Sequence, residues 1–181
     1  MTAIKGKPMA TLTKATSGLL EGHVVAPINI VKFAAFKQAC YNAHIPYSFG
    51  GKDKHPGSGK VSFPLGIDCS GFIRTLLMYS CEGAMDDMPD GSYTQGEWFA
   101  SKDFLSVPPS DCANADGHIR VCVHHPDSLD ETGHIWLTIG NKPVHTVESF
   151  GGHGPGERAW NARLRSGHTL NQLANLCFVL C

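Results

Sequence analysis

The sequence predicts one α+β domain in which N-terminal helices pack on an antiparallel β-sheet. Two stretches with helical spacing come first, at 27–44 and 68–80, and alternating stretches follow at 118–125, 134–140 and 144–149. Helices that precede a run of strands favour separate helical and sheet layers. The 181 residues, 42% of them hydrophobic, are enough for one core and too few for two ordinary domains.

Composition narrows the classes of partner and of cofactor. A formal net charge of −1 gives no basic surplus for binding nucleic acid or an anionic membrane. No stretch approaches the roughly 18 consecutive apolar residues of a membrane-spanning helix, and the basic N-terminus lacks the apolar core of a classical signal peptide. Seven cysteines without a CxxC pair argue against a disulfide framework and a structural zinc site. We therefore expect no membrane insertion, cofactor or metal. We also expect a monomer.

The N-terminal part divides into an arm and a first helix. Residues 1–26 are polar and rich in Gly, Thr and Lys, which predicts an N-terminal arm before a domain over 27–181. A proline at position 27 suits the first turn of a helix that ends before Pro46. The apolar face expected for this helix consists of Ile28, Val31, Ala35, Ala39 and Tyr41.

A second helix is predicted over 68–80, after a Gly-rich and Pro-rich loop at 50–66. Asp68 can cap this helix, and Phe72, Leu76 and Tyr79 form its apolar stripe. Cys69 then lies in the first helical turn.

The segment 81–117 predicts a covering excursion with one short helix at 92–103, which Ser92 or Thr94 could cap. The three alternating strands follow, and the closing stretch 173–181 predicts a last strand or buried element. We expect the Gly-rich segment 151–157 to be a loop.

Cys69 has two interpretations. A free cysteine is most often a small buried hydrophobe. A thiol at a helix N-terminus, however, is more readily ionised, and the thiolate is the form that attacks a carbonyl.

A nucleophilic thiol needs a base and a residue that orients the base. His134 opens the strand 134–140, where its position would be rigid, and the next strand offers Glu148 and His145. A turn centred on Asn141 would place Glu148 directly opposite His134 and keep both on one face of the sheet. A bulge would reverse this preference, so His145 remains the alternative.

These residues resemble the NlpC-type family of papain-like bacterial cell-wall peptidases. The matching stretches are IPYSFGG (45–51), GIDCSGFI (66–73) and GHIWLTIG (133–140), followed by a strand with a third polar residue. Residues 146–161 are also similar to peptidase domains in endolysins of phages that infect mycobacteria and other actinobacteria.

The resemblance implies a papain-like NlpC-type fold and a catalytic triad of Cys69, His134 and Glu148 or His145. It also implies that Tyr47 lines the site and that Asp68 and Ser70 help to bind substrate. The implied substrates are peptidoglycan stem peptides, cut between D-glutamate and a diamino acid without a metal.

A phage lysin would wait in the host cytoplasm before its release to the cell wall. The competing hypotheses are another acyl-transfer enzyme with the same triad, such as an amidase, a transglutaminase-like enzyme or an interbacterial toxin, and a non-catalytic module that binds the wall or a metal. The metal hypothesis depends on His118, Cys122, His124, His125 and His153.

Overall fold

The computed structural model describes residues 20–63, 65–126, 132–164 and 167–181. Its helices are α1 (Ile30–Asn42), α2 (Cys69–Ser80), α3 (Ser92–Ser101), the 3-10 helix η2 (Pro109–Ala113) and α4 (Leu170–Leu173). Its strands are β1 (Leu105–Ser106), β2 (Ile119–His124), β3 (His134–Ile139), β4 (His145–Phe150), β5 (Gly154–Ala159) and β6 (Leu176–Val179).

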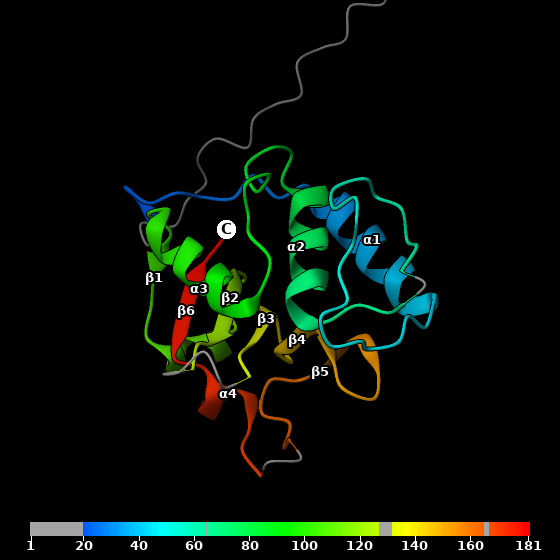
Figure 1. Cartoon of the computed structure of the whole chain (residues 1–181). Coiled ribbons are helices and arrows are strands. Elements are labelled where there is room, and N and C mark those ends of the chain that lie inside the picture. The colour runs from blue at the N-terminus through cyan, green and yellow to red at the C-terminus, as the bar shows by residue number, and fades with distance from the viewer. Residues whose placement is uncertain (1–19, 64, 127–131, 165–166) are drawn as a thin grey trace, which may run out of the picture.

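The strands form one six-stranded sheet in the order β1-β6-β2-β3-β4-β5. Every neighbouring pair is antiparallel. Helices α1 and α2 lie beside the β4–β5 end of the sheet, and α3 lies beside β2 and β6 (Figure 1). Mixed helices and an antiparallel sheet confirm the predicted α+β class.

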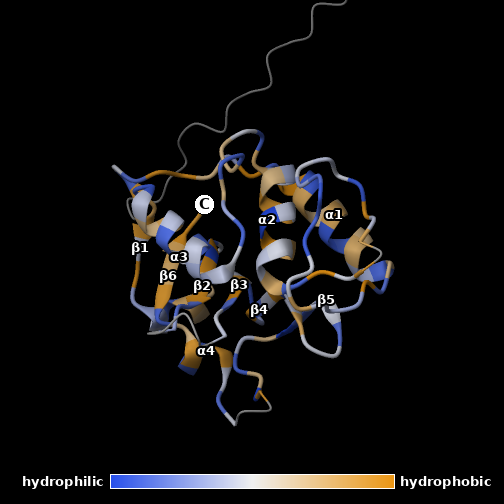
Figure 2. Ribbon diagram, viewed as in Figure 1, coloured by the Kyte–Doolittle hydropathy of each residue, from blue (hydrophilic) through white to orange (hydrophobic). Residues whose placement is uncertain are grey.

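One face of the sheet contributes to the main hydrophobic core. Alternate residues of the central strands, among them Val121, Leu137 and Val147, pack with Phe72 of α2 and Phe99 of α3, and all five are fully buried. Hydrophobic colour accordingly runs along α2 and β6 (Figure 2). The stripe expected for the second helix is confirmed, because Phe72 and Leu76 are buried and Tyr79 packs against the same core.

A second, smaller core lies on the other side of the sheet. It is built by η2 and α4 against the outward-facing residues of β2, β3 and β6. The buried members are Cys112, Cys122, Trp136, Leu170, Ala174 and Cys177.

The expected apolar face of the first helix is wrong in part. Ile28 is buried and Tyr41 packs against the main core, but Val31, Ala35 and Ala39 are exposed. Helix α1 begins at Ile30, after an N-cap in which Asn29 accepts a hydrogen bond from the Lys32 backbone. Its buried side chains are Phe33, Phe36 and Cys40, whereas Val31 is 74% exposed. The two phenylalanines bury far more apolar area than the alanines of the expected face, so they determine which side packs inward.

Two further local predictions need correction. Neither Ser92 nor Thr94 caps α3, because the N-cap position is Gly91 with φ 86° and has no side-chain capping bond. The expected loop at 151–157 is instead a turn followed by β5, which pairs with β4 along its whole length. Glycine and proline lower the strand propensity of this segment, and pairing with β4 overrides that preference.

An N-terminal arm was predicted over 1–26, and its residues 1–19 lie outside the described part of the chain. Residues 20–26 pack on the domain: Leu20 and Ala26 are buried, and the Ala26 backbone donates a 2.7 Å hydrogen bond to Leu180. Among the described residues, we find no helix with the length and apolar character needed to cross a membrane.

The β4–β5 hairpin depends on glycine at its close approach to the segment before α2. Gly154 has φ +80°, and a Cβ at this position would lie 1.8 Å from the Ile45 carbonyl oxygen. We expect Gly154→Ala to lower the free energy of unfolding by about 2 kcal/mol or more. Gly151→Ala is the matched control, because a Cβ there meets nothing within 4 Å. Urea unfolding measures both, and equal stabilities would contradict the steric argument.

Candidate active site

Cys69 is the first residue of α2, and two contacts fix its position. The Asp68 carboxylate accepts a 2.7 Å hydrogen bond from the Gly71 backbone, which caps the helix. The Ser149 hydroxyl of β4 donates a 2.8 Å hydrogen bond to the Ile67 carbonyl, which ties the chain just before the cap to the sheet. The predicted cap is confirmed, and the thiol lies where the helix dipole favours negative charge.

His134 and Glu148 form a close polar pair. His134 Nε2 lies 2.7 Å from Glu148 Oε2, and the Glu148 side chain is fully buried. Since this contact uses Nε2, the other ring nitrogen is left for the Cys69 thiol, which is near enough to form a hydrogen bond with the imidazole.

The predicted register of the hairpin is wrong by two residues. Leu137 pairs with Val147 and Thr138 with Thr146, so the turn centres on Lys142 and not on Asn141. In this register Glu148 comes opposite Trp136, two residues from the position predicted. A shift of two residues preserves the face of the sheet, and Glu148 therefore still reaches His134 diagonally.

The buried Glu148 carboxylate has two further partners besides His134. Arg158 of β5 donates from Nε to Oε1 at 2.8 Å and from Nη2 to Oε2 at 2.6 Å. The Thr146 hydroxyl donates to Oε1 at 2.6 Å. Neither of these contacts with Glu148 was predicted from the sequence, because β5 was not predicted. Side chains alternate along a strand, so Thr146 and Glu148 share one face of β4. This pattern could have indicated Thr146 as a partner of Glu148.

The pKa values of the pair reflect these contacts. Burial opposes charge on both groups. Hydrogen bonds with Cys69 and Glu148 outweigh burial at His134 and raise its pKa to about 9. Hydrogen bonds from His134 and Arg158 outweigh burial at Glu148 and lower its pKa to about 2. At neutral pH the pair is therefore an imidazolium next to a carboxylate.

The alternative third residue, His145, is directed elsewhere. It pairs with Ile139 across the β3–β4 ladder, on the face opposite to Glu148. Its Nδ1 lies 3.4 Å from Glu157, and its side chain is 42% exposed. Of the two candidates, the structure brings only Glu148 to His134.

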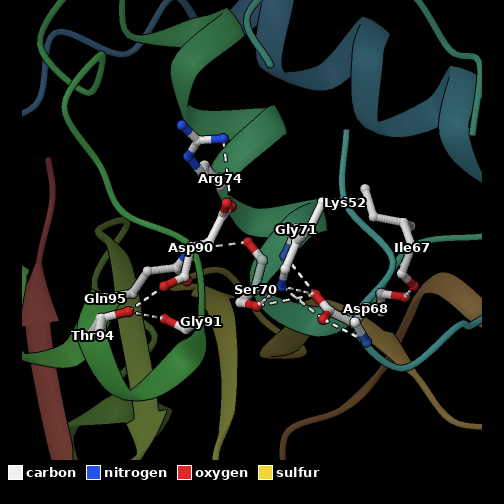
Figure 3. Close-up of polar contacts among 12 residues, drawn as sticks. Lys52, Ile67, Asp68, Ser70, Gly71, Arg74, Asp90, Gly91, Thr94 and Gln95 are labelled. Carbon is white, nitrogen blue, oxygen red and sulfur yellow. Dashed lines mark hydrogen bonds and ion pairs between the residues drawn. The ribbon is translucent and has the colours of Figure 1, made fainter. Parts of the chain in front are cut away.

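Asp68 and Ser70 are already engaged by a lysine that sequence reasoning did not single out. The Lys52 ammonium donates to Asp68 Oδ1 at 2.8 Å and to Oδ2 at 2.7 Å, and it also donates to the Ser70 hydroxyl. This polar cluster lies at the N-terminal end of α2, with Gln95 of α3 bonded to the Ser70 carbonyl (Figure 3). The charge of Asp68 is thus matched within the chain.

Tyr47 lies between two cavities that meet at the candidate site. The larger one, about 690 Å³, is lined by His134, and the smaller one, about 380 Å³, is lined by Cys69. Tyr47, Thr132 and Gly133 line both. Burial, together with the neighbouring Cys69 and Asp68, raises the pKa of Tyr47 to about 12, so its hydroxyl stays neutral. An extended chain could pass from one cavity to the other across the thiol.

The contacts of His134 predict its titration. We expect the His134 ring to titrate near pH 9, and its pKa to fall in Glu148→Gln and in Cys69→Ala, because each change removes a hydrogen bond that favours the imidazolium. Two-dimensional NMR of the histidine rings measures this. Cys40→Ala, which alters a buried thiol of α1, should leave the His134 pKa unchanged. A His134 pKa near 6.5 in all variants would contradict the described pairing.

A thiol, an imidazole, a carboxylate and a guanidinium thus converge at the start of α2, where β3, β4 and β5 meet it. No protein-family model matches the chain, and no curated protein matches it significantly.

Proposed function

We propose that this chain is a cysteine peptidase of the papain-like NlpC type that cleaves amide bonds in peptidoglycan stem peptides. The single observation that carries the proposal is the pairing of His134 with the buried Glu148 beside a thiol at a helix N-terminus. Cys69 is the nucleophile, His134 the base and Glu148 the orienting residue. Together they match the chemical requirements of nucleophilic acyl transfer.

The electrostatics of the site support nucleophilic attack by the sulfur. A protonated His134 next to Cys69 and the helix dipole of α2 both favour negative charge at this position. The backbone N–H of Cys69 has no acceptor within the helix, because the first N–H groups of any helix lack one. It can donate to the oxyanion that forms when the sulfur attacks.

The reaction follows in two steps. The Cys69 sulfur bonds to the scissile carbonyl carbon, and His134 gives its proton to the nitrogen as the carbon–nitrogen bond breaks. Water then attacks the thioester, His134 takes a proton from that water, and the carbon–sulfur bond breaks to restore the thiolate. Glu148 stays ionised throughout and holds the imidazole, while Arg158 and Thr146 hold Glu148.

The lining of the larger cavity supports an acidic peptide as substrate. Besides His134 it contains the guanidinium groups of Arg158 and Arg163 and the imidazoles of His124, His153 and His168, and the described lining contains no acidic side chain. Peptidoglycan stem peptides carry free carboxylates near the proposed scissile bond, between D-glutamate and the diamino acid. A basic wall beside His134 would attract and orient these groups.

We further propose that the chain is the catalytic domain of a phage endolysin. The resemblance of residues 146–161 to such domains supports this, and this segment contains Glu148 and Arg158. A lysin of this kind is made in the host cytoplasm and reaches the wall at lysis.

The proposal predicts the effect of removing the thiol. We expect Cys69→Ala to abolish the hydrolysis of purified actinobacterial peptidoglycan, because no other group supplies the nucleophile. Cys40→Ala, another buried cysteine, should retain activity. Mass spectrometry of the released muropeptides measures both and identifies the new amino terminus.

Three outcomes of that experiment decide between functions. A new amino terminus on the diamino acid supports the proposed bond. Cleavage elsewhere that still requires Cys69 indicates a different acyl-transfer enzyme, such as an amidase. Full activity in a folded Cys69→Ala variant, shown by an unchanged circular dichroism spectrum, would end the proposal.

The orienting residue has its own test. Glu148→Gln keeps the shape of the side chain but removes its charge, so we expect kcat/KM to fall on the order of 10²-fold. His145→Ala should leave kcat/KM nearly unchanged, because His145 lies on the opposite face and contacts Glu157. The reverse ranking of the two variants would reassign the third position to His145.

A further inference from the structure

Three cysteines far apart in the sequence meet on the side of the sheet opposite α2. Cys112 belongs to η2, Cys122 to β2 and Cys177 to β6, and all three are buried. Their sulfur atoms lie within 4.8 Å of one another, and Cys122 and Cys177 are 4.0 Å apart. We call these residues the thiol trio.

From this geometry we propose that the thiol trio is a structural site for a thiophilic divalent metal ion, with Zn²⁺ as the ion it fits best. Sulfur ligands around zinc lie about 2.3 Å from the ion, which places neighbouring sulfurs about 4 Å apart. The trio is already close to that spacing. Soft thiolate ligands also favour zinc over magnesium or calcium.

The charge near the trio fits a divalent ion. Three thiolates around a divalent ion carry one net negative charge. Arg120 is 1% exposed and interacts electrostatically with Cys122 and Cys177. Its guanidinium binds the partly exposed Asp116 at one end, with 2.8 Å between Nη1 and Oδ1. Within the described part of the chain its buried Nε has no hydrogen-bond partner, so one donor of this cation remains to be satisfied in the interior.

The surroundings shield the trio from bulk solvent. Trp136, Leu170 and Ala174 pack around the trio and keep it apolar. The three sulfurs leave the fourth position of a tetrahedral ion to a water molecule or another small ligand. The Thr138 hydroxyl lies 3.8 Å from the Cys122 sulfur and can hydrogen-bond to it. A bound ion would join η2 and the C-terminal strand β6 to β2. Because the three ligands come from separate elements, no local CxxC spacing could reveal them.

Metal binding at the trio displaces protons. Each thiol loses its proton when it binds the ion, so one Zn²⁺ replaces up to three protons and no electron is transferred. Occupancy should therefore fall at acidic pH. The ion stabilises the folded chain, because the unfolded chain does not hold the three sulfurs together.

The test uses the full chain with Cys69→Ala, so that the candidate active-site thiol cannot bind the added metal. The protein is kept reduced, freed of metal with a chelator, incubated with Zn²⁺ and dialysed, and its metal content is measured by mass spectrometry. We expect about one Zn²⁺ per chain, and Co²⁺ in its place should give a thiolate-to-metal charge-transfer absorption. Cys122→Ala in the same background should lower occupancy at least tenfold, whereas Cys40→Ala should not change it.

Several results would overturn the site. They are a folded, reduced protein that retains no Zn²⁺, equal occupancy in Cys122→Ala, and a Co²⁺ complex without the charge-transfer band. A disulfide between Cys122 and Cys177 as the only product of metal-free, reductant-free purification, with no Zn²⁺ bound after reduction, would also overturn it. If Cys122→Ala does not fold, Cys112→Ser is the replacement variant, and the Co²⁺ spectrum of the parent chain decides without any variant. None of these readouts depends on peptidase activity.

Discussion

The candidate site depends on one buried carboxylate. Glu148 has no exposed surface and yet carries a charge, which is tolerated only because its oxygens are fully engaged by hydrogen-bond donors. The donors are His134 on β3, Thr146 on the same strand, and Arg158 on β5. Three strands must keep their mutual register for these contacts to coexist. The charge of Glu148 therefore couples the geometry of the sheet to the position of the imidazole.

The thiol is positioned by the same sheet through another contact. Ser149, the neighbour of Glu148, projects from the other face of β4 and binds the carbonyl of Ile67, two residues before Cys69. Adjacent residues of one strand thus hold the base from one side and the start of α2 from the other. This arrangement brings the start of α2 and the start of β3 together at the candidate site.

The sequence was most informative where the signal is local. The cap at Asp68, the place of Cys69 in the first turn and the strand that begins at His134 all follow from spacing within one element. Glu148, and not His145, lies next to His134 as predicted, although the predicted register was wrong. The error was two residues, and a shift of two residues leaves each side chain on the same face of the strand. Arg158, Lys52 and the thiol trio could not be found in this way. Each depends on segments that are distant in the chain and meet only when β5, the 50–60 loop and β6 take their places.

Trp136 connects the small core with the candidate site. Its indole belongs to the small core around the thiol trio, and its ring also stacks on His134, with 5.4 Å between the centroids. Strand β3 carries both residues. It therefore packs against the small core on one face and against α2 on the other. Packing around Cys122 and Cys177 fixes the indole, and the indole restricts the rotation of the imidazole. The stability of the small core is in this sense a condition for the geometry at Cys69, even though no polar contact joins the two sites among the described residues.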